Sequence, residues 1–482
     1  MRSPCSPGTA LPDRAPGWHD LRTAASPPGA ADQPTHPSED PMSDPGHLPP
    51  ADDTDPAVRA AGGWGRLRQG VIYRDGVSGV RPTVPTAFPE LERRAARVLS
   101  AKAYAYVAGS AGLESTADAN RRALDRHHIV PRMLRDVSAR DLSVELFGRR
   151  LASPLLLAPI GVLELVHPEA DVAVARAAAA EGVPYILSTQ ASRPMEQCAA
   201  AMGDAPRWFQ LYWSKSEELV ASFLARAEAA GCEALVVTLD TTVLGWRARD
   251  LDLGSLPFSQ GQGIAQYTSD PVFRRLAAER AGQPKTGPKP KVTPAAVRSL
   301  FSIARTHPGP MLRNLRSPLP RAAVETFLDI FSRQDLTWGD LARLRSMTRL
   351  PILLKGLQHA DDARRALAAG VDGVIVSNHG GRQVDGATGS LDALPGIVEA
   401  VGGRVPVLFD SGVRGGADVF KALALGARAV CVGRPYCYGL ALAGADGVRQ
   451  VIQNLRAELD LTMALTGCAS LADLTPDLLA PA

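Results

Sequence analysis

Short apolar runs alternate with longer segments of helical periodicity along most of this chain. Continuous apolar runs of a few residues, bounded by Gly, Pro or polar residues, are typical of buried strands. The predicted strands are 154–159, 184–188, 207–212, 234–240, 351–355, 373–377, 406–410 and 429–434. Alanine-rich segments between them predict helices at 169–181, 193–202, 216–230, 340–347, 360–369, 391–401 and 416–425.

Eight strands that alternate with helices predict one parallel sheet. Eight parallel strands are also the number that closes a (β/α)8, or TIM, barrel. The alternative is an open, doubly wound sheet, which typically carries a G-x-G-x-x-G turn after its first strand. No such turn follows the first predicted strand. We therefore predict the α/β class and a TIM barrel.

Two segments precede the predicted barrel, which spans residues 151–482. Residues 1–60 are predicted to be a disordered tail, because thirteen of the 39 prolines fall before Ala57 among Ser, Asp, Ala and Gly. Met42 is a second possible start of translation within this tail. Residues 61–150 predict a segment that packs on the barrel, with helices at 89–109 and 116–125 and a strand pair at 144–151.

A long connection interrupts the alternation after the fourth strand. Residues 251–339 are rich in Gly, Pro and basic side chains, and between Phe273 and Phe331 eleven Lys or Arg stand against three acids. Connections of this length are uncommon unless they form a lid, an interaction loop or a disordered segment. We predict a lid or insertion loop here.

Composition excludes several classes of protein. Of the 482 residues 45% are hydrophobic and 21% charged, which is typical of a globular chain, and the formal net charge is only +3. No basic stripe with interleaved aromatics indicates nucleic-acid binding, and no apolar run is long enough to cross a membrane. The six cysteines lack metal-ligand spacing and the density of a disulfide framework, so we expect reduced thiols in a cytoplasmic protein.

Polar side chains follow all eight predicted strands at their carboxyl ends. Any one of them is explained by a cap or a solvated strand end, but active sites of TIM barrels form where these ends meet. We therefore predict one shared site. Its members are Pro159, Ile160, Gly161, Ser188, Gln210, Tyr212, Thr238, Asp240, Lys355, Ser377, His379, Arg382, Asp410, Ser411, Gly412, Gly433 and Arg434.

The last two strand ends indicate a phosphate site. Loops after strands 7 and 8 are the usual phosphate-binding position of this fold. Here they offer Gly412, Gly433, Arg414 and Arg434. The amide and hydroxyl groups of the other strand ends suit the edge of a flat heterocycle, so FMN is the predicted ligand. A phosphorylated substrate, as in an isomerase barrel, is the alternative.

The remaining charged residues predict chemistry on a small acid. His379 is a candidate base, and Asp240 is a candidate to orient its imidazole. Arg247 and Arg382 suit a carboxylate. Lys355 could form a Schiff base or supply a fixed positive charge beside a flavin. Together they predict oxidation of an acid with a hydroxyl on the carbon next to the carboxylate.

Four motifs make the chain resemble the FMN-dependent α-hydroxy acid oxidases and dehydrogenases. They are residues 377–383 (SNHGGRQ), 354–356 (LKG), 208–212 (WFQLY) and 410–414 (DSGVR), and the likeness runs from about residue 104 to 471 apart from 251–339. The resemblance implies that His379 is the base with Asp240 behind it, that Tyr106, Arg247 and Arg382 bind the substrate carboxylate, and that Tyr212 lies near its hydroxyl.

The same resemblance implies the residues that bind FMN, and it implies L-stereochemistry and a homotetramer or octamer. The implied FMN residues are Pro159, Ile160, Gly161, Ser188, Gln210, Thr238, Lys355, Ser377, Asp410, Ser411, Gly412, Val413, Arg414, Gly433 and Arg434.

Within that family the chain most resembles lactate 2-monooxygenase, in residues 129–137, 158–162, 244–247, 256–258 and 269–273. That enzyme converts lactate and O2 to acetate, CO2 and water. The alternatives are an oxidase that releases a 2-keto acid and H2O2, and a dehydrogenase that reduces quinone through a membrane-bound loop. A catalytically silent flavoprotein module is the non-enzymatic alternative, but His379, Lys355 and both arginines are present. We expect O2 as the electron acceptor and no membrane contact.

Overall fold

The computed structural model describes residues 58, 62–284 and 292–482, all of them in one compact unit. Apart from Val58, the predicted tail at 1–60 lies outside the described residues. No helix in the described part of the chain is long and apolar enough to cross a membrane.

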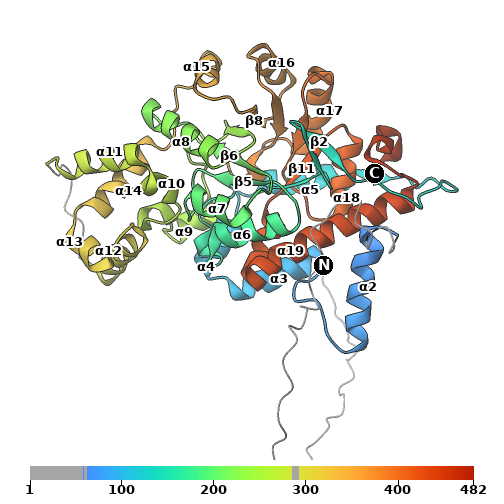
Figure 1. The fold of residues 1–482 in the computed structure, drawn as a ribbon, viewed down its shortest axis with the longest axis horizontal. Coiled ribbons are helices and arrows are strands. Elements are labelled where there is room, and N and C mark those ends of the chain that lie inside the picture. The colour runs from blue at the N-terminus through green and yellow to red at the C-terminus, as the bar shows by residue number, and fades with distance from the viewer. Residues whose placement is uncertain (1–57, 59–61, 285–291) are drawn as a thin grey trace, which may run out of the picture. The chain divides into compact units, whose positions relative to one another are not determined.

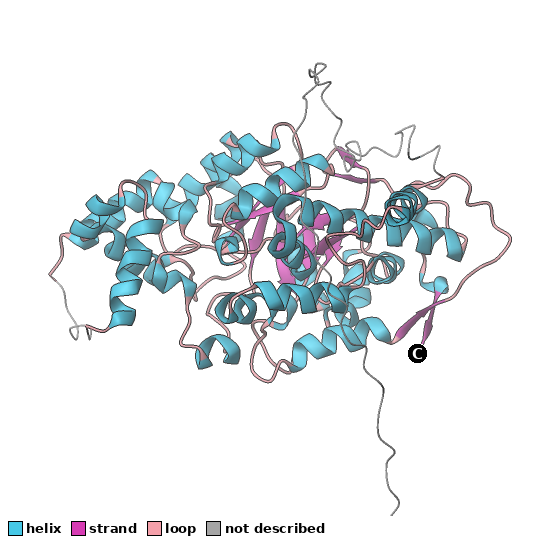
Figure 2. Ribbon diagram, turned by 90° about the horizontal axis from the view of Figure 1, so that it is seen from below, coloured by secondary structure: helices cyan, strands magenta, loops and turns pink. Residues whose placement is uncertain are grey.

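Eight parallel strands close into a barrel in the order β10-β11-β4-β5-β6-β7-β8-β9, which confirms the predicted TIM barrel (Figures 1 and 2). Successive side chains of a strand point to opposite faces. Each strand therefore sends one or two residues into an inner cluster that includes Leu156, Trp208, Ile375 and Cys431, while their neighbours pack outward against the helices. The strands are β4 (Leu155–Leu157), β5 (Tyr185–Ser188), β6 (Arg207–Leu211), β7 (Leu235–Thr238), β8 (Ile352–Leu357), β9 (Gly373–Val376), β10 (Val407–Phe409) and β11 (Ala429–Val432).

The predicted helices surround the barrel. They are α6 (Ala170–Ala180), α7 (Met195–Met202), α8 (Glu217–Ala229), α15 (Asp340–Met347), α16 (Ala360–Ala368), α17 (Ser390–Val401) and α18 (Gly416–Ala424). A long final helix, α19 (Arg434–Thr466), follows β11 and bends at Ala443 and Gly444.

The N-terminal segment covers one side and one end of the barrel. Helices α2 (Trp64–Val77) and α3 (Phe88–Val98) pack on α19. The hairpin of β2 (Val144–Leu146) and β3 (Arg149–Leu151) joins the inner cluster, with the ring of Phe147 5.6 Å from that of Trp208. This hairpin closes the end where the strands begin, which leaves the opposite end for a site.

One predicted helix of this segment is divided in two. The range 89–109 forms α3 and α4 (Ala101–Ala108), because Ser100 accepts a hydrogen bond from the backbone of Ala103 and begins a new helix. Helix α5 (Ser115–Asp125) agrees with its prediction. The final strand β12 (Leu479–Pro481) pairs with β1 (His127–Ile129).

The described residues of the predicted insertion at 251–339 are largely helical (Figure 1), and its role as a lid stays a prediction. Its helices are α9 (Ala248–Asp252), α10 (Ala265–Ser269), α11 (Pro271–Ala281), α12 (Pro294–Thr306), α13 (Met311–Arg316) and α14 (Leu319–Ile330). Prolines begin α11 and α12 rather than break them, since the first helical position needs no N–H donor. Tyr267 packs against Phe223, Phe273 and Phe327 and so fixes the insertion on α8.

Candidate active site

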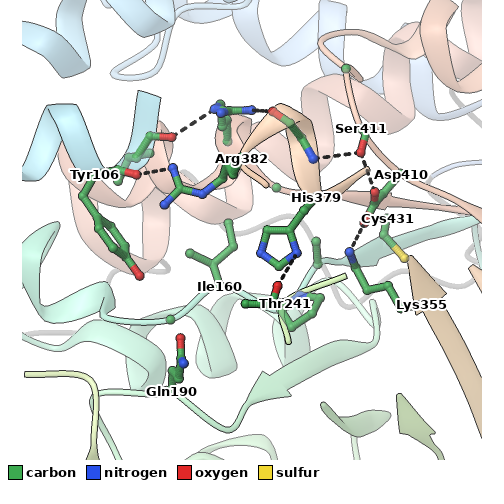
Figure 3. A pocket seen from close by; sticks show the side chains of 18 of the residues that line it. Tyr106, Ile160, Gln190, Thr241, Lys355, His379, Arg382, Asp410, Ser411 and Cys431 are labelled. Atoms are coloured by element: carbon green, nitrogen blue, oxygen red, sulfur yellow. Dashed lines mark hydrogen bonds and ion pairs between the residues drawn. The ribbon is translucent and has the colours of Figure 1, made fainter. Parts of the chain in front are cut away.

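One pocket opens where the barrel strands end, and most of the predicted site residues line it. Those that do are Tyr106, Pro159, Ile160, Gly161, Tyr212, Arg247, Lys355, His379, Arg382, Asp410, Ser411, Gly412, Val413, Arg414, Gly433 and Arg434. Five predicted residues, Ser188, Gln210, Thr238, Asp240 and Ser377, lie behind these and do not line the pocket. Figure 3 shows the close approach of side chains from distant parts of the chain.

His379 is held at the pocket by a short and unusual turn after β9. Its backbone has a φ of 58°, in the left-handed region that side-chain-bearing residues rarely adopt. The Ser377 hydroxyl accepts a hydrogen bond from the His379 amide at 3.0 Å, and the Asn378 side chain accepts one from Gly381 at 3.1 Å. Strained backbone of this kind persists where surrounding contacts fix it, and it is common at functional sites.

The imidazole of His379 is oriented by the end of β7. Its Nδ1 lies 2.8 Å from Asp240 Oδ1 and 3.4 Å from the hydroxyl of Thr241. Because Nδ1 donates to the carboxylate, the neutral ring carries its lone pair on Nε2, at the side of the pocket. A residue with this geometry can accept a proton from a bound molecule.

Burial lowers the pKa of His379, and the nearby charges of Lys355 and Arg247 act in the same direction, while Asp240 opposes them. Burial would raise the pKa of Asp240, but His379 and Lys355 outweigh it and lower that pKa to about 2. At neutral pH the dyad therefore consists of a neutral imidazole and a carboxylate.

A glycine makes room for this carboxylate. Gly356 has a φ of +109°, and a Cβ at this position would stand 2.9 Å from Asp240 Cβ. A residue larger than glycine at position 356 would push Asp240 away from His379.

Lys355 forms a buried ion pair at the same end of the barrel. Its Nζ lies 3.0 Å from Asp410 Oδ2 and donates to the Ser377 hydroxyl at 2.7 Å. Burial would lower the pKa of Lys355, but Asp410 and Asp240 raise it above its usual value. The ammonium is therefore a fixed positive charge.

Two guanidinium groups face the pocket, and neither forms an ion pair with a carboxylate of the described residues, although the charge of Asp250 acts on both. Arg247 donates to the side-chain oxygen of Gln383 at 3.0 Å and to the backbone oxygen of Arg382 at 3.3 Å. Arg382 donates to the backbone oxygens of Tyr106 and Gly109 and lies over the Tyr106 ring, 5.0 Å from its centroid. Burial and the charge of Arg382 lower the pKa of Arg247 to about 10. An anionic ligand between them would relieve this repulsion.

A second cationic region lies at the ends of β10 and β11. Arg434 donates to three backbone oxygens and to the Ser110 hydroxyl at 2.9 Å. Burial, followed by the charges of Arg414 and Arg382, lowers the pKa of Arg434 to about 9. Ser411 and Gly412 form a left-handed turn beside it, with φ values of 84° and 90°. This region can bind a second anionic group such as a phosphate.

The sequence predictions missed several residues of the site. Thr241, Gln190 and Leu244 line the pocket or touch His379. Buried Asn120 of α5 exchanges two side-chain hydrogen bonds with Asn378, at 2.9 and 2.7 Å, and so ties the N-terminal segment to the end of β9. Thr241 and Leu244 could have been found from their closeness to Asp240 and Arg247 in sequence. Nothing in the sequence connects Asn120 with Asn378.

Known proteins share this fold and much of this sequence. The family model of FMN-dependent dehydrogenases matches residues 95–481. An FMN-dependent alpha-hydroxy acid dehydrogenase of Penicillium citrinum is 45% identical over 84% of this chain and 93% of its own length. An L-lactate oxidase of Lysinibacillus sphaericus is 42% identical over 81% of this chain and 91% of its own length. Among solved structures, mandelate oxidase with (S)-4-hydroxymandelic acid matches with a TM-score of 0.67 and 38% identity, over 82% of this chain and 98% of that one.

Proposed function

The chain belongs to the FMN-dependent dehydrogenase family, and on this premise we propose that it is an L-lactate 2-monooxygenase. At the level of the family it is an FMN-dependent α-hydroxy acid oxidoreductase. The proposal concerns the substrate, L-lactate, and the outcome, in which lactate and O2 give acetate, CO2 and water. It rests mainly on the His379–Asp240 dyad, which faces two arginines that form no ion pair with a described carboxylate.

The strand ends fit FMN. Gln210 Nε2 and Thr238 Oγ1 are buried without a hydrogen-bond partner among the described residues, and they stand on neighbouring strands. Together with Ser188 and the turn at 159–161, they would hold the heterocycle, and Arg414 and Arg434 would hold the phosphate. When bound, FMN accepts two electrons from the substrate and passes them to the final acceptor.

The residues around the substrate have separate roles in the proposed reaction. Arg247 and Arg382 bind the carboxylate and fix the orientation of the acid. His379 Nε2 takes the proton that leaves the substrate, and Asp240 stabilises the imidazolium that results. Tyr212, whose pKa burial raises to about 12, stays protonated and donates a hydrogen bond near the substrate hydroxyl.

Lys355 acts as a fixed charge rather than as a Schiff-base nucleophile. A nucleophilic lysine must lose its proton, and the pKa of Lys355 is raised by Asp410 and Asp240 against the effect of burial. The ammonium would therefore stabilise negative charge on a bound flavin.

The helical insertion supports the monooxygenase outcome over simple release of the keto acid. The Gly263 amide donates to Glu164 at 2.9 Å, and Ala265 donates to the backbone of Ala191 at 3.1 Å. These bonds fix the insertion to the loops after β4 and β5, beside the pocket. None of the described residues of the insertion lines the pocket, but a rigid segment at its rim would slow product escape and would keep pyruvate and peroxide together long enough to react.

A simple oxidase is the second candidate, which the 42% identity to an L-lactate oxidase favours. Product analysis after aerobic turnover with L-lactate separates the two. We expect acetate and CO2 without accumulation of H2O2. Pyruvate with an equal amount of H2O2 would establish the oxidase, and reduction of a quinone without O2 uptake would establish the dehydrogenase.

The proposal extends to assembly and location. We expect a homotetramer or octamer in the cytoplasm, where the five described cysteines, all buried and unpaired, stay reduced. Light scattering of the purified protein measures the assembly.

A further inference from the structure

The turn that carries His379 has a backbone that needs support from its surroundings. His379, Gly380 and Gly381 are consecutive residues in the left-handed region, with φ values of 58°, 67° and 80°. Only the first of them carries a side chain, and residues with side chains rarely adopt this conformation. Such a backbone persists where neighbouring groups hold it. The position of the His379 imidazole therefore depends on what packs against the turn.

Helix α5 of the N-terminal segment packs against this turn at two points. A Cβ on Gly381 would stand 2.7 Å from the backbone nitrogen of Ala117, so the helix leaves no room for a side chain there. Further along α5, the side chain of Asn120 meets that of Asn378, the residue before His379. Asn120 and Asn378 are both buried, with 2% and 5% exposed, and neither lines the pocket.

The orientation of the Asn120 side chain is set by a backbone group that can only donate. Its Oδ1 accepts a hydrogen bond from the Ser390 amide at 2.9 Å, at the start of α17. Its Nδ2 therefore points toward Asn378, where it donates to Oδ1 at 2.9 Å. The Asn378 Nδ2 donates to Asn120 at 2.7 Å and to the Thr388 carbonyl at 3.1 Å. The two side-chain amides thus have one consistent arrangement.

Asn378 passes this arrangement on to the turn. Its Oδ1, which accepts from Asn120, also accepts from the Gly381 amide at 3.1 Å, and this bond spans His379. Without Asn120, the Asn378 side chain would lose a donor and gain room to rotate, so its bond to Gly381 would no longer be fixed. The His379 imidazole would then no longer be held at 2.8 Å from Asp240.

We propose that Asn120 is a positioning residue, which holds His379 against Asp240 from outside the pocket. The inference rests on the proposed role of His379 as the base. A base that is displaced from its productive geometry slows the reaction. The Arg382 side chain is held separately, by backbone oxygens of the segment 106–109. Loss of Asn120 should therefore affect the rate of reaction more than the binding of the carboxylate.

Thr116→Val is the matched control for Asn120→Ala. Thr116 is also buried in α5, and its hydroxyl donates to the Val384 carbonyl and accepts from the Ala387 amide, both at 2.8 Å. Valine keeps the shape of the side chain and removes both hydrogen bonds. The control therefore weakens the contact of α5 with the segment 384–387 and leaves the contact with Asn378 intact.

Anaerobic flavin reduction by L-lactate compares the holoenzymes. We expect Asn120→Ala to lower the limiting rate by about 10- to 100-fold. The lactate concentration that gives half of this rate should stay near that of wild-type protein. Thr116→Val should keep the wild-type rate. A limiting rate for Asn120→Ala that equals that of Thr116→Val would overturn the inference.

A double-mutant cycle tests the route through Asn378. If Asn120 acts through Asn378, the variant with both residues changed to alanine should reduce its flavin as slowly as Asn378→Ala alone. Effects of the two substitutions that multiply would show that Asn120 does not act through Asn378, and would overturn the inference.

Hydrogen–deuterium exchange gives a measurement that does not depend on turnover. The amides of His379, Gly380 and Gly381 are hydrogen-bonded to side chains, so exchange in 377–383 reports how firmly the turn is held. Exchange should be faster in Asn120→Ala than in wild-type protein and unchanged in Thr116→Val. Asn120→Asp, which keeps the bond from Ser390 and loses the donation to Asn378, should show the same changes to a smaller extent and serves if the alanine variant does not fold.

The outcomes also separate this inference from the proposed function. If L-lactate fails to reduce the flavin of wild-type protein, the proposed substrate is wrong, while exchange in 377–383 still decides whether Asn120 holds the turn. If L-lactate reduces wild-type protein, Asn120→Ala and Thr116→Val at one rate, the role of Asn120 is wrong and the proposed function stands.

Discussion

The two hydrogen-bonded pairs of a basic and an acidic residue at the mouth of the barrel have similar geometry and opposite properties. His379 and Asp240 lie 2.8 Å apart, and Lys355 and Asp410 lie 3.0 Å apart. Around His379, burial and the cations Lys355 and Arg247 favour the neutral ring. Around Lys355, the two carboxylates Asp410 and Asp240 favour the charged ammonium despite burial. The distance within a pair therefore does not decide whether its proton can move, whereas the neighbouring charges do.

The proposed reaction requires both a group that gains and loses a proton and a group whose charge stays constant. A base must change its protonation state during each turnover, and its pKa should lie near or below the working pH. A group that stabilises charge on a cofactor must keep its own charge throughout. Asp240 serves both pairs, since its charge raises the pKa of His379 and that of Lys355.

Replacement of His379, the base of the His379–Asp240 pair, should give the largest effect on the rate of flavin reduction. We expect His379→Gln to lower the rate of anaerobic flavin reduction by L-lactate by about 10²–10⁴-fold, the usual contribution of a general base. Flavin content should remain that of wild-type protein, as absorbance after gel filtration will show. Full retention of the reduction rate would remove His379 from the role of base.

Replacement of Lys355, the cation of the Lys355–Asp410 pair, should lower both the stability of the fold and the binding of the cofactor. Lys355→Met leaves Asp410 buried without its partner, and breaking a buried pair in this way costs about 3–5 kcal/mol. Urea denaturation measures the loss, and Lys102→Met at an exposed position of α4 is the control. Unchanged stability with full flavin content would show that the ammonium is not needed as a fixed charge.

Asp240→Asn should have a smaller effect, because the amide oxygen can still accept a hydrogen bond from His379 Nδ1. We expect the rate of flavin reduction to fall by about 10–100-fold, since one charge that stabilises the imidazolium is lost. The apparent pKa of the reaction should also fall, because Asp240 raises the pKa of His379. A variant whose rate profile keeps the wild-type pKa would contradict the coupling between these residues.

The sequence predicted the barrel and most of the pocket because both depend on local signals. Each strand is a continuous apolar run followed at once by its polar residues, so the order along the chain places those residues at one end of the sheet. The motif at 377–383 concentrates the base and an arginine in one turn. Local sequence is thus sufficient to predict the roles of His379 and Arg382.

What the sequence missed depends on contacts between distant segments. A loop is predicted for the insertion because it is long and rich in Gly, Pro and basic residues, whereas Pro271 and Pro294 each begin a helix, and both helices pack on α14. Gln190 lies in an ordinary polar stretch, and only the approach of Gly161 and the insertion shows that its amide faces the pocket.

The pH dependence of anaerobic flavin reduction by L-lactate tests the central claim most directly. The neutral form of His379 accepts the proton, so the rate should rise as pH increases through the pKa of His379. That pKa is lowered from 6.5, so the rate should already be at its plateau at neutral pH, while Lys355 keeps its charge throughout. A rate that continues to rise well above neutral pH, or that does not fall in acid, would contradict the assignment of a neutral His379 as the base.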